Sequence, residues 1–306
     1  MFSNAGPDAC FGWGGWNLDQ TADVLVAAGQ MREVILVAVN NGRFRYQEYR
    51  GPEKAGASKS KTAAGRFENY ARFLTRELKP RIDRTFRTRP GPAHTGVMGS
   101  SLGGICSLAL AWEQTNIFGL AASLSGSFQI EGARFLKTIL RKRRAGAKPF
   151  RVYLDSGVID HGGDDDGREL TTQVAAELRR IGWRDGRNLL HHVDASPLTE
   201  AELERSGLRR DKWGEARTSQ HNEFYWRLRA GARWRFRFHR AGDLVGGLPR
   251  SAAVAKPGRS SHAVTGAWKD STRFAIRTRC GWSPRHNRAP SAFEGSATAP
   301  RPASAR

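Results

Sequence analysis

The stretch 94–110 constrains the fold more than any other part of the sequence. It consists of a short apolar segment, a turn of small residues and a longer apolar segment, which predicts a buried strand, a sharp turn and a helix. The turn, Gly99-Ser100-Ser101-Leu102-Gly103, fits the pattern G-x-S-x-G. Glycines at both ends remove side chains that would collide in so tight a turn, which leaves the Ser101 hydroxyl exposed at its tip.

This turn makes Ser101 a candidate nucleophile. The N–H of Leu102 opens the predicted helix, where unpaired donors and the helix dipole favour a negatively charged oxygen, so Leu102 is a candidate oxyanion donor. The five residues alone also fit a glycine-rich turn with a buried serine of no chemical role. The predicted strand before the turn and helix after it favour the catalytic interpretation, because the motif requires that context.

Segments with the patterns of strands and helices alternate along the chain as far as residue 240. Apolar runs predict strands at 34–39, 118–125, 150–155 and 188–193. Helical spacing of apolar residues predicts helices at 18–28, 67–82, 133–144, 169–181 and 223–239. Residues 40–49 and 51–66 are expected to be loops. This alternation predicts an α/β fold with a doubly wound, mainly parallel sheet.

The composition changes beyond residue 240. Residues 241–306 are rich in Ala, Gly, Ser and Pro, show no sustained periodicity and hold 11 Lys and Arg against 3 Asp and Glu. We therefore expect two parts, a folded domain at 1–240 and a largely disordered basic tail at 241–306.

The formal net charge of the chain is +21, which first suggests a polyanionic partner. Outside the tail, however, the arginines are interspersed with acids, and no helix-turn-helix, zinc-finger or RNA-binding motif accompanies them. We therefore expect no specific binding to nucleic acid. No apolar run reaches the length of a membrane span, so none is expected.

The three cysteines, Cys10, Cys106 and Cys280, lie far apart in the sequence. Their odd number and wide spacing predict no disulfide framework and no metal site. No signal peptide is visible at the N-terminus. We expect a cytoplasmic protein without a cofactor or a metal.

A serine hydroxyl becomes an effective nucleophile only when a base removes its proton and an acid orients that base. The candidate bases are His191, His192 and His221. The first two fall within a predicted strand, whereas His221 lies in a predicted loop just before the final helix. Since a base has to stand in a loop at the edge of the sheet, His221 is preferred.

The candidate acids follow the predicted strand 150–155. Asp160 is preferred because it lies past the end of the strand, from where a carboxylate can reach the histidine. Asp155 is the second candidate, since it can instead accept hydrogen bonds from backbone donors at the end of the strand. The run Asp164-Asp165-Asp166 is interpreted as a solvated turn that places negative charge at the next helix N-terminus, and Asp194 is a weaker candidate.

Together these motifs resemble the Putative esterase family of α/β hydrolases, which includes esterase D-type and enterochelin esterase-type enzymes. The matching segments follow one another between residues 11 and 230: 40–42 with Arg45, Glu48 and Tyr49, then 77–83, 99–104, 118–119, 125–128, 154–157, 221–223 and Trp226. The resemblance implies an α/β-hydrolase fold and a serine carboxylesterase that acts on a small-molecule ester. It also implies that Ser101 is the nucleophile, Asp160 the acid and His221 the base.

The chain departs from this family at both ends. Family members begin with a strand and a loop of the type aspartate-glycine-glutamine-asparagine-leucine-phenylalanine, whose backbone contributes to the oxyanion hole. This chain starts near the end of that loop, so we expect one or more N-terminal edge strands to be absent. The source of the second oxyanion donor is then open. At the other end, arginines interrupt residues 233–240, where relatives have an apolar turn.

The substrate is the least constrained feature. The loops 41–66 and 195–220 are expected to line the site, and Arg45 and Ser100 are candidate substrate-binding residues. Thioesterase, acyltransferase and peptidase activities use the same triad. The alternative of a different class is a noncatalytic or inactive α/β-hydrolase-like binding protein.

Overall fold

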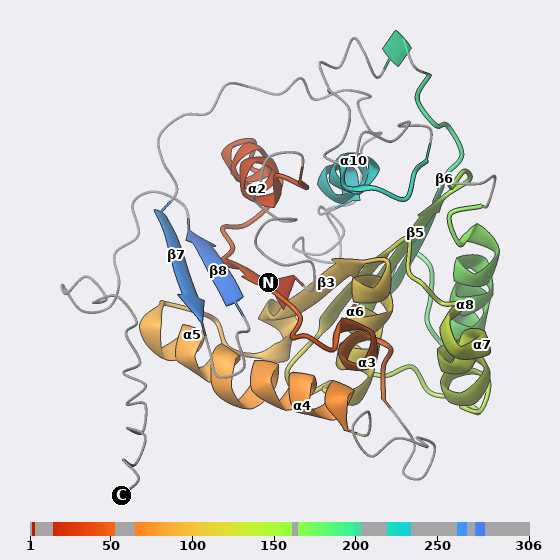
Figure 1. Cartoon of the computed structure of the whole chain (residues 1–306), viewed down its shortest axis with the longest axis horizontal. Coiled ribbons are helices and arrows are strands. Elements are labelled where there is room, and N and C mark those ends of the chain that lie inside the picture. Colours follow the sequence, from red (N-terminus) through yellow and green to blue (C-terminus); the bar gives the residue numbers. More distant parts are fainter. Residues whose placement is uncertain are drawn as a thin grey trace, which may run out of the picture.

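In the computed structural model, the described residues are 2–3, 15–52, 65–160, 165–199, 201–202, 219–233, 262–267 and 273–278. They form an eight-stranded sheet in the order β6-β5-β4-β3-β1-β2-β8-β7, with helices on both faces (Figure 1). The strands are β1 (Phe2–Ser3), β2 (Leu36–Val39), β3 (Gly96–Ser100), β4 (Leu120–Leu124), β5 (Arg151–Gly157), β6 (Leu189–Asp194), β7 (His262–Ala267) and β8 (Arg273–Thr278).

Strands β1 to β6 run parallel to one another. Strand β3, which leads into Ser101, lies between β1 and β4, with Gly96 opposite Leu120 and Ser100 opposite Leu124. Since parallel strands end at the same edge, the segments that follow β3, β4 and β5 meet there. The predicted doubly wound, mainly parallel sheet is confirmed.

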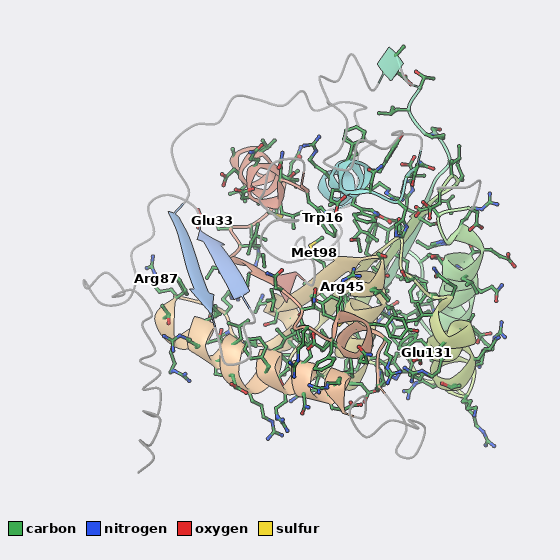
Figure 2. The ribbon with its side chains drawn as sticks, in the orientation of Figure 1. Trp16, Glu33, Arg45, Arg87, Met98 and Glu131 are labelled. Atoms are coloured by element: carbon green, nitrogen blue, oxygen red, sulfur yellow. The ribbon has the colours of Figure 1, made fainter. Side chains whose placement is uncertain are left out.

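Helices cover both faces of this sheet, and adjacent residues of one strand point to opposite faces. Val97 belongs to the buried cluster that includes residues of α4–α8, whereas Met98, labelled in Figure 2, belongs to the buried cluster with residues of α2 and α10. The helical segments are α2 (Leu18–Ala27), α3 (Arg45–Tyr49), α4 (Arg66–Arg72), η1 (Phe73–Leu78), α5 (Lys79–Thr85), η2 (Pro92–His94), α6 (Leu102–Glu113), α7 (Ile130–Arg134), η3 (Phe135–Leu140), α8 (Arg168–Ile181) and α10 (Glu223–Arg233). Within the described ranges, none of these helices is long and apolar enough to cross a membrane.

Within the described residues, the predicted helices and strands occur close to their expected positions, with one difference in the region 40–49. Residues 234–239 of the last predicted helix lie outside the described residues. In the region 40–49, Arg45–Tyr49 forms the short helix α3 where a loop is predicted. Tyr49 is 1% exposed and its hydroxyl lies 3.4 Å from that of Tyr70 on α4. Burial of this ring, a tertiary effect, explains a helix that the local pattern does not indicate.

The edge of the sheet beside β2 is formed by residues from the C-terminal part of the chain. Strand β8 pairs antiparallel with β2, from Leu36 opposite Arg277 to Val39 opposite Phe274, and β7 pairs antiparallel with β8. Two segments of the tail that is expected to be largely disordered, 262–267 and 273–278, thus form strands in the structure. The rest of 241–306 lies outside the described residues, and the division of the chain at residue 240 stays a prediction.

Truncation after residue 240 removes β7 and β8 and leaves the apolar strand β2 without a partner on that side. Because an unpaired apolar edge is a template for association, we expect the truncated protein to self-associate more than the full chain in light scattering. Truncation after residue 280 keeps both strands and is the matched control. Equal scattering by the two truncated proteins at the same concentration would contradict the pairing.

Candidate active site

Ser101 occupies a strained turn between β3 and α6. Its backbone has φ 54° and ψ −126°, a region that residues other than glycine rarely adopt and that costs on the order of 1–3 kcal/mol. A Cβ atom on Gly99 would lie 2.4 Å from the carbonyl oxygen of Gly103, so the close approach requires glycine at 99. The predicted strand, turn and helix are confirmed.

The atoms around Ser101 suit a developing negative charge. The Ser101 hydroxyl lies 3.1 Å from the hydroxyl of Ser127, whose N–H also donates to the Ser101 carbonyl at 3.1 Å. The N–H of Leu102, the first residue of α6, makes no hydrogen bond to any described residue. Leu102 therefore has a free donor where the oxyanion is expected. Residues 4–14, which follow β1, lie outside the described part of the chain.

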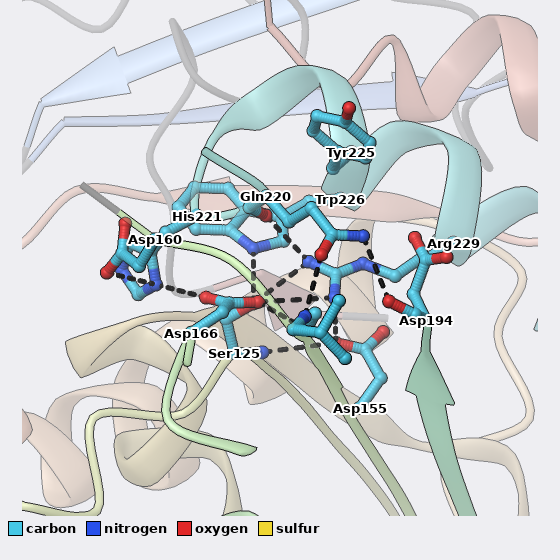
Figure 3. Close-up of polar contacts among 12 residues, drawn as sticks. Ser125, Asp155, Asp160, Asp166, Asp194, Gln220, His221, Tyr225, Trp226 and Arg229 are labelled. Carbon is cyan, nitrogen blue, oxygen red and sulfur yellow. Dashed lines mark hydrogen bonds and ion pairs between the residues drawn. The ribbon is translucent and has the colours of Figure 1, made fainter. Parts of the chain in front are cut away.

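His221 is held by Asp166, as Figure 3 shows. Nδ1 of His221 is 2.7 Å from Oδ1 of Asp166. Because a carboxylate only accepts, this contact places the imidazole proton on Nδ1 and leaves Nε2 as the acceptor. Within the described ranges no hydrogen bond joins Ser101 to His221. Hydrogen bonds of this type often close only when substrate is bound.

The acid in contact with the histidine is therefore not the preferred candidate from the sequence. Asp160 lies farther away, with Oδ2 at 3.9 Å from His221 Nδ1, and accepts from the hydroxyl of Ser219 at 2.7 Å. The Ser219 hydroxyl in turn accepts from the N–H of His221 at 3.0 Å. Through Ser219, Asp160 thus fixes the backbone N–H of His221, whereas Asp166 hydrogen-bonds to the imidazole ring.

Asp166 differs from the solvated turn that the sequence suggests. It is 1% exposed, with φ 52°, and the next residue, Gly167, has φ 69°. These two left-handed residues turn the Asp166 side chain inward, just before α8 begins. Asp165 behaves as predicted, since Oδ2 accepts from the N–H of Glu169 in the first turn of α8 at 2.9 Å.

The second oxygen of Asp166 is fixed by groups from other elements. Oδ2 accepts from the Ser125 hydroxyl at 2.7 Å and from the N–H of Gly157 at 2.5 Å. Burial raises the pKa of Asp166, but the hydrogen bond from His221 and the charge of Arg229 outweigh burial and hold the pKa below its usual value. Asp166 is therefore ionised near neutral pH.

Trp226 on α10 holds the imidazole ring from another side. Its ring meets the His221 ring edge-on, with centroids 5.1 Å apart, and packs against Trp16 with centroids 5.8 Å apart. Trp226 Nε1 donates to the Ser125 hydroxyl at 2.9 Å. The histidine is thus oriented by both a carboxylate and an aromatic ring.

The other acids and histidines of the sequence analysis have different positions. Asp155 is fully buried and accepts from the N–H of Ser125 at 3.1 Å and from the Tyr153 hydroxyl at 2.7 Å. This contact matches the expected backbone cap at the end of the strand. His191 and His192 both lie in β6, as predicted, and Asp194 is the last residue of that strand.

The candidate substrate-binding residues lie on two elements. Arg45 is exposed at the start of α3 (Figure 2). Its guanidinium carbon is 5.9 Å from the centre of the Tyr49 ring. Ser100 ends β3 and is 8% exposed. Their contact with substrate stays a prediction.

Asp160, Asp166 and His221 also bring carboxylate and imidazole atoms within 4.8 Å of one another. Two carboxylates and an imidazole can ligate a metal. In this group, however, Nδ1 of His221 is engaged by Asp166 and Oδ1 of Asp160 by Ser219. We therefore interpret the group as a carboxylate–imidazole pair with a supporting carboxylate.

The fold is that of an α/β-hydrolase, with Ser101 in the turn after β3 and a histidine that is hydrogen-bonded to a carboxylate in the loop before α10. The sequence model of the family described as Putative esterase matches residues 14–196, more than half of the chain. The chain belongs to this family, and membership supports hydrolysis of esters as its reaction class. No curated protein sequence matches the chain.

One solved structure supports the fold. A ferulic acid esterase superimposes with a TM-score of 0.52 at 14% identity, over 78% of this chain and 83% of that chain. The enterobactin esterase from Shigella flexneri gives a TM-score of 0.47 at 16% identity, over 67% of this chain and 44% of that chain. The chain thus spans less than half the length of that esterase.

Replacing Gly99 by Ala tests the close approach at the turn. The added Cβ meets the Gly103 backbone, so we expect a loss of stability of about 1–3 kcal/mol in chemical unfolding. Gly91→Ala is the matched control, because a Cβ there has no heavy atom within 4 Å. Equal unfolding midpoints for the two variants would contradict the geometry of the turn.

Proposed function

We propose that this protein is a serine hydrolase that cleaves carboxylic esters of small molecules through an acyl-enzyme intermediate. Ser101 is the nucleophile, His221 the general base and Asp166 the acid that orients the histidine. The observation that carries the proposal is the 2.7 Å contact between His221 Nδ1 and Asp166 Oδ1, at the edge of the sheet where the strained Ser101 turn stands.

The reaction begins when the Ser101 hydroxyl rotates from Ser127 toward Nε2 of His221. The histidine takes the hydroxyl proton while the serine oxygen attacks the ester carbonyl. The N–H of Leu102 stabilises the resulting oxyanion. The imidazolium then returns the proton to the leaving alcohol, and the acyl group remains on Ser101.

Deacylation repeats these steps with water as the nucleophile. His221 takes a proton from the attacking water, and the second tetrahedral intermediate collapses to release the acid and free Ser101. Throughout, ionised Asp166 stabilises the imidazolium and keeps the proton on Nδ1. The low pKa of Asp166 fits this role, because a protonated acid would not stabilise an adjacent cation.

One observation favours a noncatalytic binding protein as the second candidate. Within the described ranges, Ser101 contacts Ser127 and makes no hydrogen bond to His221. A binding protein needs no hydrogen bond between Ser101 and His221, whereas an esterase requires that bond when substrate is bound. Labelling of the serine distinguishes the two candidates, since only a base-activated serine reacts rapidly with a fluorophosphonate.

The Ser101→Ala variant tests the nucleophile. We expect fluorophosphonate labelling to disappear and hydrolysis of p-nitrophenyl acetate to fall by about 10⁴-fold or more, because no other group supplies the attacking oxygen. Mass spectrometry of the labelled wild-type protein locates the modified residue. Ser127→Ala is the neighbouring control and is expected to keep the label. Undiminished labelling of Ser101→Ala would refute the assignment.

The Asp166→Asn and Asp160→Asn variants decide which carboxylate is the acid. Asn at 166 keeps the shape but removes the charge and alters the imidazole tautomer, so we expect kcat to fall by about 10⁴-fold. Asp160 hydrogen-bonds to Ser219 and stands 3.9 Å from His221 Nδ1, farther than Asp166, so Asp160→Asn is expected to lower kcat by less than about tenfold. Steady-state kinetics with p-nitrophenyl acetate measures both. The reverse ranking would restore Asp160 as the acid.

A further inference from the structure

Arg229 on α10 is an arginine buried next to the site. Its exposed fraction is 4%, and it lies one turn after Tyr225 and Trp226, on the face of α10 that packs against the sheet. A buried guanidinium is costly unless charged and polar partners surround it. The groups that contact the Arg229 guanidinium therefore indicate its role in the site.

The Arg229 guanidinium contacts four residues of the site (Figure 3). Nη2 donates to the Ser125 hydroxyl at 2.9 Å and to the Gln220 carbonyl oxygen at 3.0 Å. Nη1 lies 3.4 Å from Oδ2 of Asp166 and 3.6 Å from Oδ1 of Asp155. One cation thus faces two buried carboxylates and the residue before His221.

We propose that Arg229 is a positioning residue for ester hydrolysis, which fixes Asp166 against His221 and offsets the second buried carboxylate, Asp155. This inference rests on the proposed function. Arg229 contacts neither Ser101 nor the ring of His221 in the structure, so it acts through Asp166, Ser125 and Gln220.

The contacts of Ser125 explain how the Asp166 carboxylate keeps its orientation. A hydroxyl has one donor and two acceptor sites. Ser125 donates to Asp166 and accepts from Trp226 and Arg229. Because the two acceptor sites are occupied by donors, the Ser125 proton can point only to Oδ2 of Asp166. Oδ1 is then left for His221.

Arg229 also holds the backbone in front of the histidine. Its bond to the Gln220 carbonyl links α10 to the residue that precedes His221. The side chain of Gln220 continues this link, since its oxygen accepts from the N–H of Val158 at 2.7 Å and its nitrogen donates to the Asp194 carbonyl at 3.0 Å. The histidine loop is thus fastened to β5 and β6.

Arg229 also affects the charge balance around the imidazole. The titratable groups around Arg229 and the imidazole, among the described residues, come from four places. They are Asp155 and Tyr153 on β5, Asp194 on β6, Asp160 and Asp166 after β5, and His221 before α10. Burial raises the pKa of Asp155 above its usual value, against the opposing charge of Arg229. Among the described residues, Arg229 is the arginine or lysine paired with Asp155 and Asp166. Its loss would therefore leave more negative charge near His221 and favour the imidazolium.

The charge change therefore predicts the direction of a pH effect. For Arg229→Met we expect the acid limb of the kcat/KM profile to move to higher pH by about one unit, since the lost cation opposed the imidazolium. We expect kcat to fall by about 10- to 100-fold, with KM changed by less than about threefold, because substrate does not touch Arg229. Arg229→Lys keeps the charge, so its acid limb should stay near that of the wild type.

Arg227→Met is the matched control on the same helix. Arg227 is half-buried, and its guanidinium carbon is 5.4 Å from the centre of the Phe224 ring. We expect its pH profile to coincide with that of the wild type. A shift as large as in Arg229→Met would show that loss of any arginine from α10 has this effect, and would overturn the proposal.

Asp155→Asn tests the same balance with the opposite sign. Removing one negative charge leaves Arg229 to Asp166 alone, so the acid limb should move to lower pH. The variant keeps an acceptor for the N–H of Ser125 and so tests the charge balance even if Arg229→Met does not fold. Acid limbs unchanged in Asp155→Asn and in Arg229→Met would overturn the proposal.

A measurement without catalysis separates this inference from the proposed function. NMR titration of the His221 ring in Ser101→Ala protein, with and without Arg229→Met, reports the charge balance directly. If the wild type hydrolyses no ester but the midpoint of the His221 signal moves up in Arg229→Met, the proposed function fails and the coupling stands. If the wild type is active and the midpoint does not move, Arg229 has no such role.

Discussion

The site depends on one buried carboxylate, Asp166. Its two oxygens have separate partners: Oδ1 binds the imidazole of His221, and Oδ2 binds Ser125, Gly157 and Arg229. These partners come from the turn after β4, the end of β5 and the final helix with its preceding loop. A carboxylate buried to 1% exposure is stable as an anion only with such partners. The orientation of the His221 ring therefore depends on the groups that hydrogen-bond to the Asp166 carboxylate.

The parallel sheet is what brings these partners together. Strands β3, β4 and β5 are neighbours and run in the same direction, so Ser101, Ser125 and the loop with Asp166 all follow carboxyl ends at one edge. Helix α10 packs above this edge through Trp226 and carries Arg229, and the loop just before it carries His221. The Ser101 turn adds a second constraint, since its positive φ is held only because glycine at 99 permits the close approach.

Much of this arrangement could be predicted from the sequence. The strand, turn and helix around Ser101 were predictable because the glycine spacing and the flanking apolar runs are all local. The loop position of His221 was predictable from the order of the elements. The family was identifiable as well, since its segments occur in order along the chain. For the acid, in contrast, several aspartates follow β5, and spacing does not distinguish them.

The sequence by itself determined the α/β class, the identity of the turn serine and the loop of the histidine, because each depends on neighbours within a few residues. Only the tertiary structure decided that Asp166 and not Asp160 hydrogen-bonds to the His221 ring, since that choice depends on an inward turn at Asp166 and on donors that follow β4 and β5 or lie on α10. It also decided that β8 pairs with β2. Both are contacts between segments far apart in the chain, and no local pattern encodes which partners will meet.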